Sequence, residues 1–429
     1  MRNEYLTRVI DEELEYYLEA FGAVLITGPK WCGKTTSAEQ KAKSVLKLQD
    51  PDKSLGYLIT AETKPSLLLK GAKPRLIDEW QMVPILWDAI RTSVDELQEE
   101  GLYILTGSTT VDEKTIMHSG IGRIARLKML PMSLYESGDS NGTISLKKLF
   151  NDNNYLIDGK KSNLSIEELI FVACRGGWPS SLNTKSNRAK LLIAKSYVDN
   201  VTMNDISTVD GKVKDPSKVK QLLRSYARNI ATTATNKTII DDINVNVKLS
   251  ETSFYEYVNA LNKLFVISNI PAWNPSIRSK TSIRSLEKKM FIDPSIAVAA
   301  LGLTPDKLTQ DLNTFGFIFE NLCSRDLEVY SMSLRGRISY YRDREGLEVD
   351  AVLHLDDGRY ALIEFKLGSK QIEEGAKHLL KVCSLIEKAN LNKKTKIKKP
   401  DILMIITGGE MAYTRNDGVK IIPIGCLKQ

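Results

Sequence analysis

The stretch GPKWCGKTT, residues 28–36, constrains the fold of this chain more than any other feature. It follows an apolar run over 23–27 that predicts a strand, and it opens a predicted helix over 35–43. The spacing G-x-x-x-x-G-K-T between a strand and a helix is the context of a phosphate-binding loop. The glycines let backbone N–H groups converge on phosphate oxygens, and the helix N-terminus adds partial positive charge. The sequence therefore predicts an α/β domain with a nucleotide site at this turn.

The residues expected to bind ATP, the predicted cofactor, form one continuous loop: Gly28, Pro29, Lys30, Trp31, Cys32, Gly33, Lys34, Thr35 and Thr36. We expect Lys34 to reach the β- and γ-phosphates and the Thr35 hydroxyl to bind Mg²⁺. The alternative is a chance glycine turn before a helix. The predicted strand before the loop and the predicted helix after it favour the nucleotide site.

A second motif, KPRLIDEW over 73–80, ends a short apolar strand in two acids, Asp78 and Glu79. In P-loop enzymes a strand-end aspartate holds Mg²⁺, and a glutamate directly after it can act as general base toward the attacking water. The alternative is a helix N-terminus whose dipole favours acidic residues. Because the pair follows a complete P-loop, we assign Asp78 to the metal and Glu79 to catalysis.

Two further positions are candidates for catalysis. The apolar strand over 102–107 ends at Ser108, and strand carboxyl ends line the ligand crevice of a parallel sheet. We expect Ser108, or Thr106 near it, to hydrogen-bond the γ-phosphate or the attacking water, with a plain turn as the alternative. Arg123 is a candidate arginine finger, in cis or from a neighbouring subunit, with a solvated loop arginine as the alternative.

Other segments of this region carry weaker patterns. Apolar residues at helical spacing, from Leu6 to Leu18, predict a helix over 1–20 with a core-facing stripe. A short strand is expected over 45–49, and helices are expected over 62–69 and 83–97. This alternation of strands and helices agrees with a parallel sheet.

The order of the motifs is itself informative. A P-loop, LIDE, LTGS and GR…LPMSLYE follow one another over residues 28–136. This order resembles the prokaryotic AAA-like ATPases that carry a C-terminal domain of unknown function of the DUF4143 type. The resemblance implies an AAA-like parallel-sheet ATPase core over 1–135 that hydrolyses ATP. It implies no particular biological role.

Residues 136–212 are expected to form a polar insertion and a helical lid. The segment 136–163 is rich in Gly, Ser, Asn, Asp and Lys, which marks an insertion or a surface connection. Helices are expected over 165–173 and 185–205. The turn RGGWP between them resembles a turn motif of the family. Its Arg175 is either a contact to the nucleotide or, as we favour, part of a structural turn.

Residues 213–300 are expected to form a winged helix. Three helices over 217–230, 239–243 and 250–264 precede two strands over 265–270 and 289–293. Such a unit can lie on DNA phosphates or pack against protein, and the sequence leaves both open. The residues expected to face DNA are Asn259, Lys263, Arg278, Lys280 and Arg284.

Residues 301–429 contain a predicted hairpin whose register decides the chemistry. Strands over 347–355 and 359–366 flank a three-residue turn that ends in Gly358, a favoured turn type. In that register Asp350 lies opposite Glu364, and opposed Cβ atoms are about 5 Å apart. Two carboxylates this close repel unless one is protonated or a cation lies between them. A two-residue turn would separate them.

This hairpin, with Glu320 on a preceding helix, resembles the PD-(D/E)xK nuclease core. The resemblance implies a restriction-endonuclease-like α/β domain, completed by a helix over 371–387. Its site would consist of Glu320, Asp350, Glu364 and Lys366. In such sites the carboxylates bind Mg²⁺ and the lysine directs hydroxide toward phosphorus. The alternatives are a binding module without cleavage and an edge hairpin with a solvated acidic face.

Composition bounds the remaining choices. The net charge of +7 permits DNA binding but is equally explained by solubility. Five scattered cysteines and three histidines favour a reducing cytoplasm and disfavour structural zinc. No run of about 18 apolar residues predicts a membrane span. We therefore expect a cytoplasmic, Mg²⁺-dependent ATPase with a nuclease-like domain, in an undetermined oligomeric state. The alternatives are an ATP-regulated DNA nuclease and a slow nucleotide switch that binds protein or nucleic acid.

Overall fold

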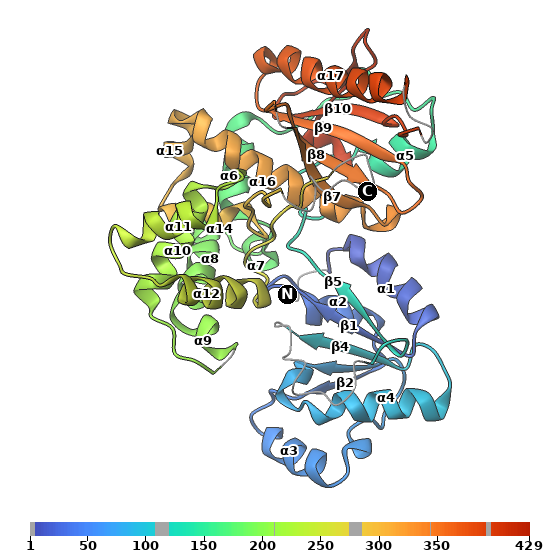
Figure 1. Ribbon diagram of the computed structural model, residues 1–429. Coiled ribbons are helices and arrows are strands. Elements are labelled where there is room, and N and C mark those ends of the chain that lie inside the picture. Colours follow the sequence, from blue (N-terminus) through green and yellow to red (C-terminus); the bar gives the residue numbers. More distant parts are fainter. Residues whose placement is uncertain (1–4, 108–119, 210, 274–284, 344, 392–395) are drawn as a thin grey trace. The chain divides into compact units, whose positions relative to one another are not determined.

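The computed structural model describes residues 5–107, 120–209, 211–273, 285–343, 345–391 and 396–429 (Figure 1). Contacts divide the chain into two compact units, which are described separately. The N-terminal unit is built on Thr7–Pro131. The C-terminal unit is built on Met132–Asn262 and Val266–Gln429.

The N-terminal unit is an α/β unit around a five-stranded sheet in the order β2-β3-β4-β1-β5. All of its strand pairs are parallel, as the sequence predicted. The strands are β1 (Ala23–Thr27), β2 (Ser44–Lys47), β3 (Arg75–Asp78), β4 (Tyr103–Gly107) and β5 (Ile124–Lys128). The helices are α1 (Val9–Ala20), α2 (Lys34–Lys41), α3 (Ser54–Thr63), α4 (Ile85–Leu97) and the short 3₁₀ turns η1 (Pro65–Leu67) and η2 (Trp80–Met82).

Strand β1 is apolar along its length because both faces of the sheet are covered. Ala23 and Leu25 pack into a core with residues of α3 and α4. Val24 and Ile26 pack into a second core with residues of α1 and α2. A strand buried on both faces reads as a continuous apolar run rather than an alternating one. This burial holds the end of β1, from which the P-loop departs.

Two helices differ from the sequence-based expectation. In the part of the chain that the structure describes, the first helix begins at Val9, whereas the sequence predicted a start at residue 1. The Arg8 N–H bonds the Asp11 carboxylate at 2.7 Å in a capping box, which fixes this start. Leu6 therefore lies outside the expected stripe and is exposed. The helix expected over 62–69 is instead α3, which ends at Thr63. Pro65 disfavours helical backbone at the residue before it and starts the separate turn η1.

The first part of the C-terminal unit is helical. Its helices are α6 (Ile166–Arg175), α7 (Pro179–Leu182), α8 (Asn187–Asn200), the π-helical turn η4 (Val201–Asp205), α9 (Ile206–Thr208), α10 (Pro216–Arg228), α11 (Asn236–Asn244), α12 (Glu251–Lys263), α14 (Pro294–Leu301) and α15 (Pro305–Gln310). The three helices expected over 217–264 are thus present as α10, α11 and α12.

The two strands expected after α12 are reduced to isolated antiparallel bridges, Ile267–Phe291 and Ile270–Lys288. The Met290 N–H also bonds the Asn269 side chain, at 3.3 Å, and such a side-chain acceptor competes with a regular ladder. The residues expected on the intervening turn, Arg278, Lys280 and Arg284, lie outside the described residues.

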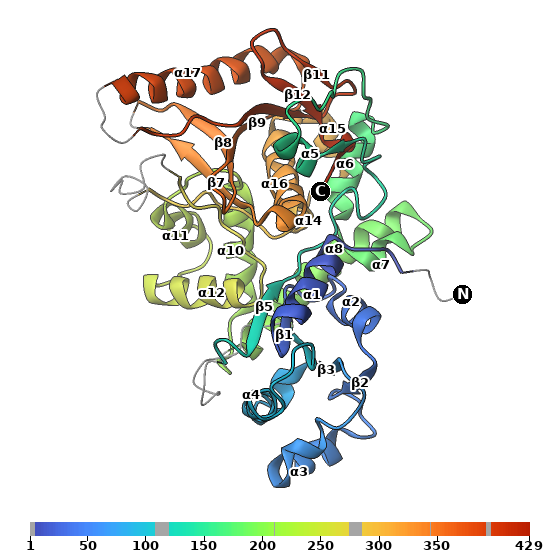
Figure 2. The same cartoon turned by 90° about the vertical axis from the view of Figure 1, so that its right-hand side faces the viewer.

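The second part of the C-terminal unit is a mixed six-stranded sheet in the order β11-β12-β10-β9-β8-β7. Helices α16 and α17 pack against it, with α17 above the sheet and α16 beneath it in Figure 2. The elements are α16 (Leu312–Tyr330), the 3₁₀ turns η5 (Met332–Leu334), η6 (Ser369–Gln371) and η7 (Ile424–Cys426), α17 (Ile372–Leu391), β7 (Arg337–Arg342), β8 (Glu348–His354), β9 (Tyr360–Lys366), β10 (Ile402–Thr407), β11 (Tyr413–Thr414) and β12 (Lys420–Pro423).

The register predicted for the β8–β9 hairpin is confirmed. The pairs run from His354–Tyr360 to Ala351–Ile363, the register that sets Asp350 against Glu364. The turn closes with a Leu355 N–H to Arg359 C=O bond of 2.8 Å. Gly358 has a φ of +83°, which explains why glycine is suited to the last turn position.

The polar segment 136–163 packs against the C-terminal sheet region instead of forming a separate insertion. Its strand β6 (Ile144–Ser145) pairs with β13 (Leu427–Lys428), and α5 (Leu146–Asn151) follows. The Ser162 N–H bonds the Glu410 carbonyl at 2.8 Å, so the segment is attached at several points. Its polar composition reflects these backbone and side-chain hydrogen bonds.

The RGGWP turn is structural, as favoured from the sequence. Arg175 is buried and forms a bidentate pair with Asp139, at 2.6 and 3.2 Å. A Cβ at Gly177 would lie 2.2 Å from the Met132 carbonyl oxygen, so only glycine fits there. Arg175 is therefore committed to holding this turn.

All five cysteines are free thiols. No helix in the described parts of the chain has the length and apolar character needed to cross a membrane.

Candidate functional site

The predicted P-loop forms a closed turn between β1 and α2. Gly28 has a φ of +151° and Gly33 a φ of +101°, both in the region that favours glycine. A Cβ at Gly28 would lie 2.2 Å from the Met129 carbonyl oxygen. The Lys34 ammonium is turned into the loop and donates to the carbonyls of Gly28 (3.0 Å) and Pro29 (2.8 Å). The loop thus already holds a buried positive charge where phosphate is expected.

The rest of the loop divides by exposure. Cys32 is buried, Thr36 and Trp31 are exposed, and Trp31 has a φ of +66°. Such left-handed backbone is uncommon for a residue other than glycine. Lys30 is half-buried beside Trp31. The geometry of the loop is therefore set by backbone and glycine, as a phosphate cradle requires.

Arg8 braces the loop and was missed by the sequence analysis. Its guanidinium donates to the Cys32 carbonyl at 2.9 Å and to the Leu130 carbonyl at 2.8 Å. It thereby connects the P-loop to the segment just after β5. An arginine near the N-terminus carries no motif, so only its long-range contacts reveal this role.

Asp78 is the centre of the site and is fully buried. Its Oδ1 accepts hydrogen bonds from the hydroxyls of Thr35 (2.7 Å) and Thr106 (2.6 Å). Its Oδ2 accepts a bond from the Gln49 amide at 3.2 Å. Because β4 lies between β1 and β3, the carboxyl ends of all three strands bring these residues together. The predicted pair of Thr35 and Asp78 is therefore in contact.

Two neighbours of Asp78 extend the prediction. Thr106 was the alternative to Ser108, and Ser108 itself lies outside the described residues. Gln49 was not predicted, although it follows β2 at the same edge of the sheet. Polar residues directly after a parallel strand are the signal that would have identified it.

Glu79 follows Asp78 with a φ of +56°, a strained backbone conformation for a residue with a side chain. Its N–H donates to the Thr106 hydroxyl at 3.3 Å, and its carboxylate accepts a bond from Gln81. Thr106 therefore contacts both acids of the motif. This arrangement orients Glu79 relative to Asp78.

Arg123 is far from the P-loop of its own chain, which corrects the expectation of a finger in cis. It directly precedes β5, and its carbonyl accepts a bond from Ala23, the first residue of β1. The P-loop follows the last residue of β1, roughly 16 Å away along the strands. The Arg123 side chain pairs with Asp95 at 2.7 Å. Parallel strands place these two ends at opposite edges of the sheet.

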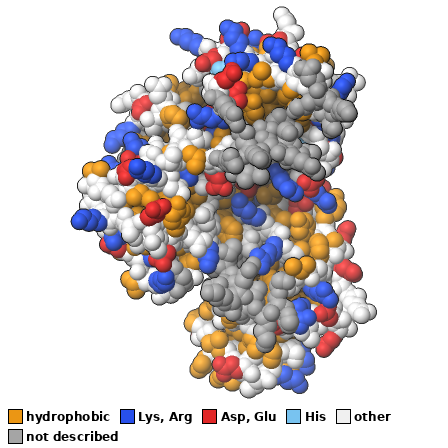
Figure 3. All heavy atoms as spheres, in the orientation of Figure 1, with side chains coloured by type: hydrophobic (Ala, Val, Ile, Leu, Met, Phe, Trp, Pro, Cys, Tyr) orange, Lys and Arg blue, Asp and Glu red, His pale blue; other side chains and the backbone are white. Residues whose placement is uncertain are grey.

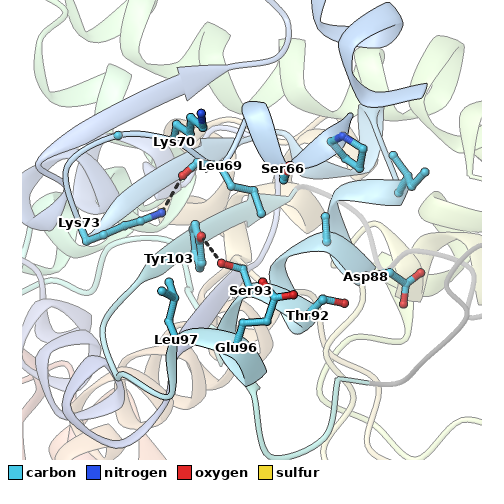
Figure 4. A pocket seen from close by; sticks show the side chains of 14 residues that line it. Ser66, Leu69, Lys70, Lys73, Asp88, Thr92, Ser93, Glu96, Leu97 and Tyr103 are labelled. Carbon is cyan, nitrogen blue, oxygen red and sulfur yellow. Dashed lines mark hydrogen bonds between the residues drawn. The ribbon is translucent and has the colours of Figure 1, made fainter. Parts of the chain in front are cut away.

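A separate pocket of about 720 Å³ lies at the amino edge of this sheet (Figure 4). Tyr103, the first residue of β4, lines it and hydrogen-bonds Ser93 at 2.8 Å. The Lys73 ammonium lies 3.6 Å from the centre of the Tyr103 ring. Burial, followed by the charge of Arg75, lowers the pKa of Lys73 to about 8. The pocket is thus distinct from the predicted nucleotide site at the carboxyl edge.

In the C-terminal unit, the hairpin brings three of the four predicted nuclease-like residues together. The Lys366 ammonium lies 2.7 Å from a Glu364 oxygen and 3.7 Å from an Asp350 oxygen. The same Asp350 oxygen accepts the Phe365 N–H at 2.8 Å. Burial and the charge of Asp350 raise the pKa of Glu364 to about 8, although Lys366 acts against this shift.

Glu320, the fourth predicted residue, is paired with a lysine that the sequence analysis missed. Lys288 donates to Glu320 at 2.7 Å and lies 2.9 Å from Glu348. Burial raises the pKa of Glu320 to about 8 against the attraction of Lys288. Burial alone would lower the pKa of Lys288, but Glu320, Asp350 and Glu348 outweigh it and raise that pKa. Lys288 is therefore an ammonium ion at neutral pH.

These residues do not fit a divalent metal as they stand. Among the described residues, no group of three or more His, Cys, Asp or Glu side chains is placed to hold a metal ion. The carboxylates that would converge on Mg²⁺ are instead shared between Lys288 and Lys366. The hairpin register is as expected, the nuclease-like character stays a prediction, and the expected metal centre is not formed by the described residues.

Three family models match separate segments of the chain. Residues 20–138 match an AAA domain, and residues 166–307 match a domain of unknown function (DUF8612). Residues 315–427 match a domain of unknown function (DUF4143). No curated protein matches the chain.

Two solved structures have weak overall similarity to the chain. The Walker-type ATPase PABY2304 of Pyrococcus abyssi is 15% identical, with a TM-score of 0.43, over 70% of this chain and 97% of that one. A structure of Drosophila ORC bound to DNA is 12% identical, with a TM-score of 0.21, over 65% of this chain and 89% of that one. The segment matches are the stronger finding: a segment near the N-terminal end matches an AAA domain, and a segment near the C-terminal end matches a DUF4143 domain.

Proposed function

We propose that the N-terminal unit binds and hydrolyses ATP with Mg²⁺. The observation that carries this proposal is the contact of Thr35 with Asp78 beside a lysine-bearing glycine loop. A P-loop threonine and a strand-end aspartate are the two groups that hold Mg²⁺ in such enzymes. The match of residues 20–138 to an AAA domain supports the same activity.

The residues of the site have separate roles in this proposal. Lys34 leaves the carbonyls of Gly28 and Pro29 and binds the β- and γ-phosphates, since a charged phosphate is a stronger acceptor than a carbonyl. Thr35 and Asp78 would hold Mg²⁺, which supplies positive charge to the phosphate oxygens. Glu79 accepts a proton from the attacking water. Thr106, and Ser108 beyond it, orient the two acids and the γ-phosphate.

Arg123 can act as an arginine finger only if a second copy of the chain supplies it. Its position at the amino edge of the sheet separates it from the P-loop of the same chain. We propose that it acts in trans or, failing that, only pairs with Asp95. Adding an Arg123→Ala chain to a Lys34→Ala chain distinguishes these, because activity recovered by mixing requires one chain to complete the other.

Steady-state phosphate release tests the ATPase proposal. The wild type should release phosphate from ATP with Mg²⁺ and stop when the metal is chelated. Lys34→Ala should release none. Tight nucleotide binding by the wild type without sustained release would instead identify a slow nucleotide switch.

We also propose that residues 213–300 form a winged helix and that DNA is the partner class. Helices α10 to α12 followed by two antiparallel bridges support the topology, and Asn259 and Lys263 lie on α12. On the face drawn in Figure 3, basic side chains are interspersed with acidic ones, so charge marks no DNA-binding surface on that face. ATPase stimulation by duplex or single-stranded DNA tests this proposal. An unchanged rate with DNA would leave a protein partner.

A further inference from the structure

Lys288 places an ammonium ion among the acids of the C-terminal unit. Its backbone is held by reciprocal bonds with Ile270, N–H to O at 2.9 Å and O to N–H at 3.0 Å. Its side chain is fully buried and lies 5.3 Å from the centre of the Tyr340 ring. Because two backbone hydrogen bonds and the surrounding side chains hold Lys288, its ammonium lies at one defined position.

Three oxygens from two elements surround that position. They are carboxylate oxygens of Glu320 on α16 (2.7 Å) and Glu348 on β8 (2.9 Å), and the backbone carbonyl oxygen of Asp350 (3.4 Å). Carboxylate and carbonyl oxygens around a buried positive charge are the ligand types that hard divalent cations also use. Here the ammonium ion of Lys288 occupies the position that such a cation would take.

The other two acids lie beside a second lysine. Lys366 lies between Glu364 and Asp350, at 2.7 and 3.7 Å. Glu364 Oε1 is buried and accepts no hydrogen bond from the described residues. Four acidic side chains therefore lie beside two ammonium ions, and among the described residues no three of these acids are placed to hold one metal.

We propose that Lys288 is a built-in cation that takes the place of a divalent metal in the carboxylate cluster of the C-terminal unit. While Lys288 is in position, the cluster joins the Lys288 segment to α16 and β8 and is not a metal-dependent nuclease centre. Removing the ammonium leaves oxygens of Glu320 and Glu348 close together with no cation between them. A divalent cation then restores the balance of charge, because oxygen ligands of the right kind are already assembled. This proposal does not depend on the ATPase proposal.

The test counts Mn²⁺ ions bound to the full chain without nucleotide, by electron paramagnetic resonance. Mn²⁺ uses the same oxygen ligands as Mg²⁺ and is directly observable. We expect Lys288→Ala to bind one more Mn²⁺ per chain than the wild type, and Lys288→Ala/Glu320→Gln to lose that ion. Mn²⁺ should also raise the Tm of Lys288→Ala and leave that of the wild type unchanged.

The neighbouring lysine is a matched control. Lys289 is also buried, but its ammonium bonds Asn236 at 3.3 Å rather than the carboxylates. Lys289→Ala should therefore bind no additional Mn²⁺. A gain in both variants would show that losing any buried lysine attracts the ion, which overturns the proposal.

A second arm decides the matter if Lys288→Ala does not fold. Glu320→Gln keeps Lys288 and leaves one fewer acid. The proposal predicts that this variant binds as many Mn²⁺ ions as the wild type. A wild-type Mn²⁺ ion that is lost in Glu320→Gln would show that the cluster is a metal site after all. A folded Lys288→Ala chain that binds no additional Mn²⁺ would also overturn the proposal.

Discussion

The two units bring buried acids together in opposite ways. Around Asp78 the partners are the hydroxyls of Thr35 and Thr106 and an amide, which are neutral. The nearby lysine, Lys34, is bound to backbone carbonyls and is available to a stronger acceptor. Around Glu320 and Glu364 the partners are ammonium ions. The first arrangement leaves a negative and a positive charge for a ligand to satisfy, whereas the second satisfies its charges internally.

This difference distinguishes the N-terminal unit, whose charges are open to a ligand, from the C-terminal unit, which only resembles a nuclease. Both units carry residues in an order typical of phosphate chemistry. Only the N-terminal one keeps its acid and its lysine apart, and in our proposal Mg²⁺ binds the acid and phosphate binds the lysine. In the C-terminal unit the lysines lie on the acids. A motif therefore identifies the residues, and the partner of each charge determines what those residues can do.

The largest effect that we expect concerns Lys34. Lys34→Ala removes the ammonium that we expect to bind the phosphates, and it should weaken ATP binding by about 10³-fold or more. Titration with a fluorescent ATP analogue measures this change. Lys43→Ala, an exposed lysine just beyond α2, is the control and should bind normally. Equal affinity of Lys34→Ala and Lys43→Ala would place the nucleotide elsewhere.

A stability effect of similar size is expected for charges that are satisfied internally. Arg325 is buried between Asp293 (2.8 Å) and Asp326 (2.6 Å), and Arg325→Met leaves both acids without a counter-charge. The free energy of unfolding should fall by about 3 kcal/mol or more. Arg337→Met, which removes an exposed pair with Asp356, should cost below about 1 kcal/mol in the same urea titration. Similar losses of unfolding free energy in both variants would show that the buried ion pairs of Arg325 stabilise the fold no more than an exposed pair does.

A smaller effect is expected at Thr106. Thr106→Val removes the hydroxyl that bonds Asp78 and accepts the Glu79 N–H, while keeping the shape of the side chain. Turnover should fall about 10- to 100-fold, as is usual for a residue that orients a metal ligand. ATP affinity should change little, which distinguishes this variant from Lys34→Ala. Unchanged turnover would show that Asp78 is oriented without Thr106.

The smallest expected effect is a dependence of stability on pH that comes from Glu364. Burial and Asp350 raise its pKa from 4.5 to about 8, while Lys366 lowers it; Glu320 and His378 also face it. The unfolded chain loses this proton near its ordinary pKa, and the folded chain keeps it until about pH 8. Stability should therefore fall as pH rises between these values. Urea unfolding of the wild type and Glu364→Gln at pH 5.5 and 8 should show a smaller fall in the variant.

The parts of the molecule that could be predicted from the sequence are those fixed by local rules. The P-loop follows from glycine spacing between a strand and a helix. The β8–β9 register follows from a three-residue turn ending in Gly358, and it correctly set Asp350 against Glu364. The position of Arg123 was not predicted, because no strand was expected directly after it; β5 places it at the amino edge of the sheet.

The parts that could not be predicted depend on contacts between distant residues. Lys288 is 32 residues from Glu320 and 62 from Asp350, and nothing in its neighbourhood marks it among 60 lysines and arginines. Arg8 reaches Leu130 across 122 residues. Such charges acquire a role only when folding buries them beside their partners. The prediction of a helix over 62–69 is wrong for a local reason instead, because Pro65 disfavours helical backbone at Lys64.

The most direct test of the account compares Glu79→Gln with the wild type in two measurements on the same samples: ATP binding and Mg²⁺-dependent phosphate release. We expect Glu79→Gln to bind ATP normally and its phosphate release to fall by about 10² to 10⁴-fold, the usual contribution of a general base. Gln81→Ala, which removes only the side chain that bonds Glu79, should keep most of the activity. Equal phosphate release by Glu79→Gln and the wild type would contradict the account.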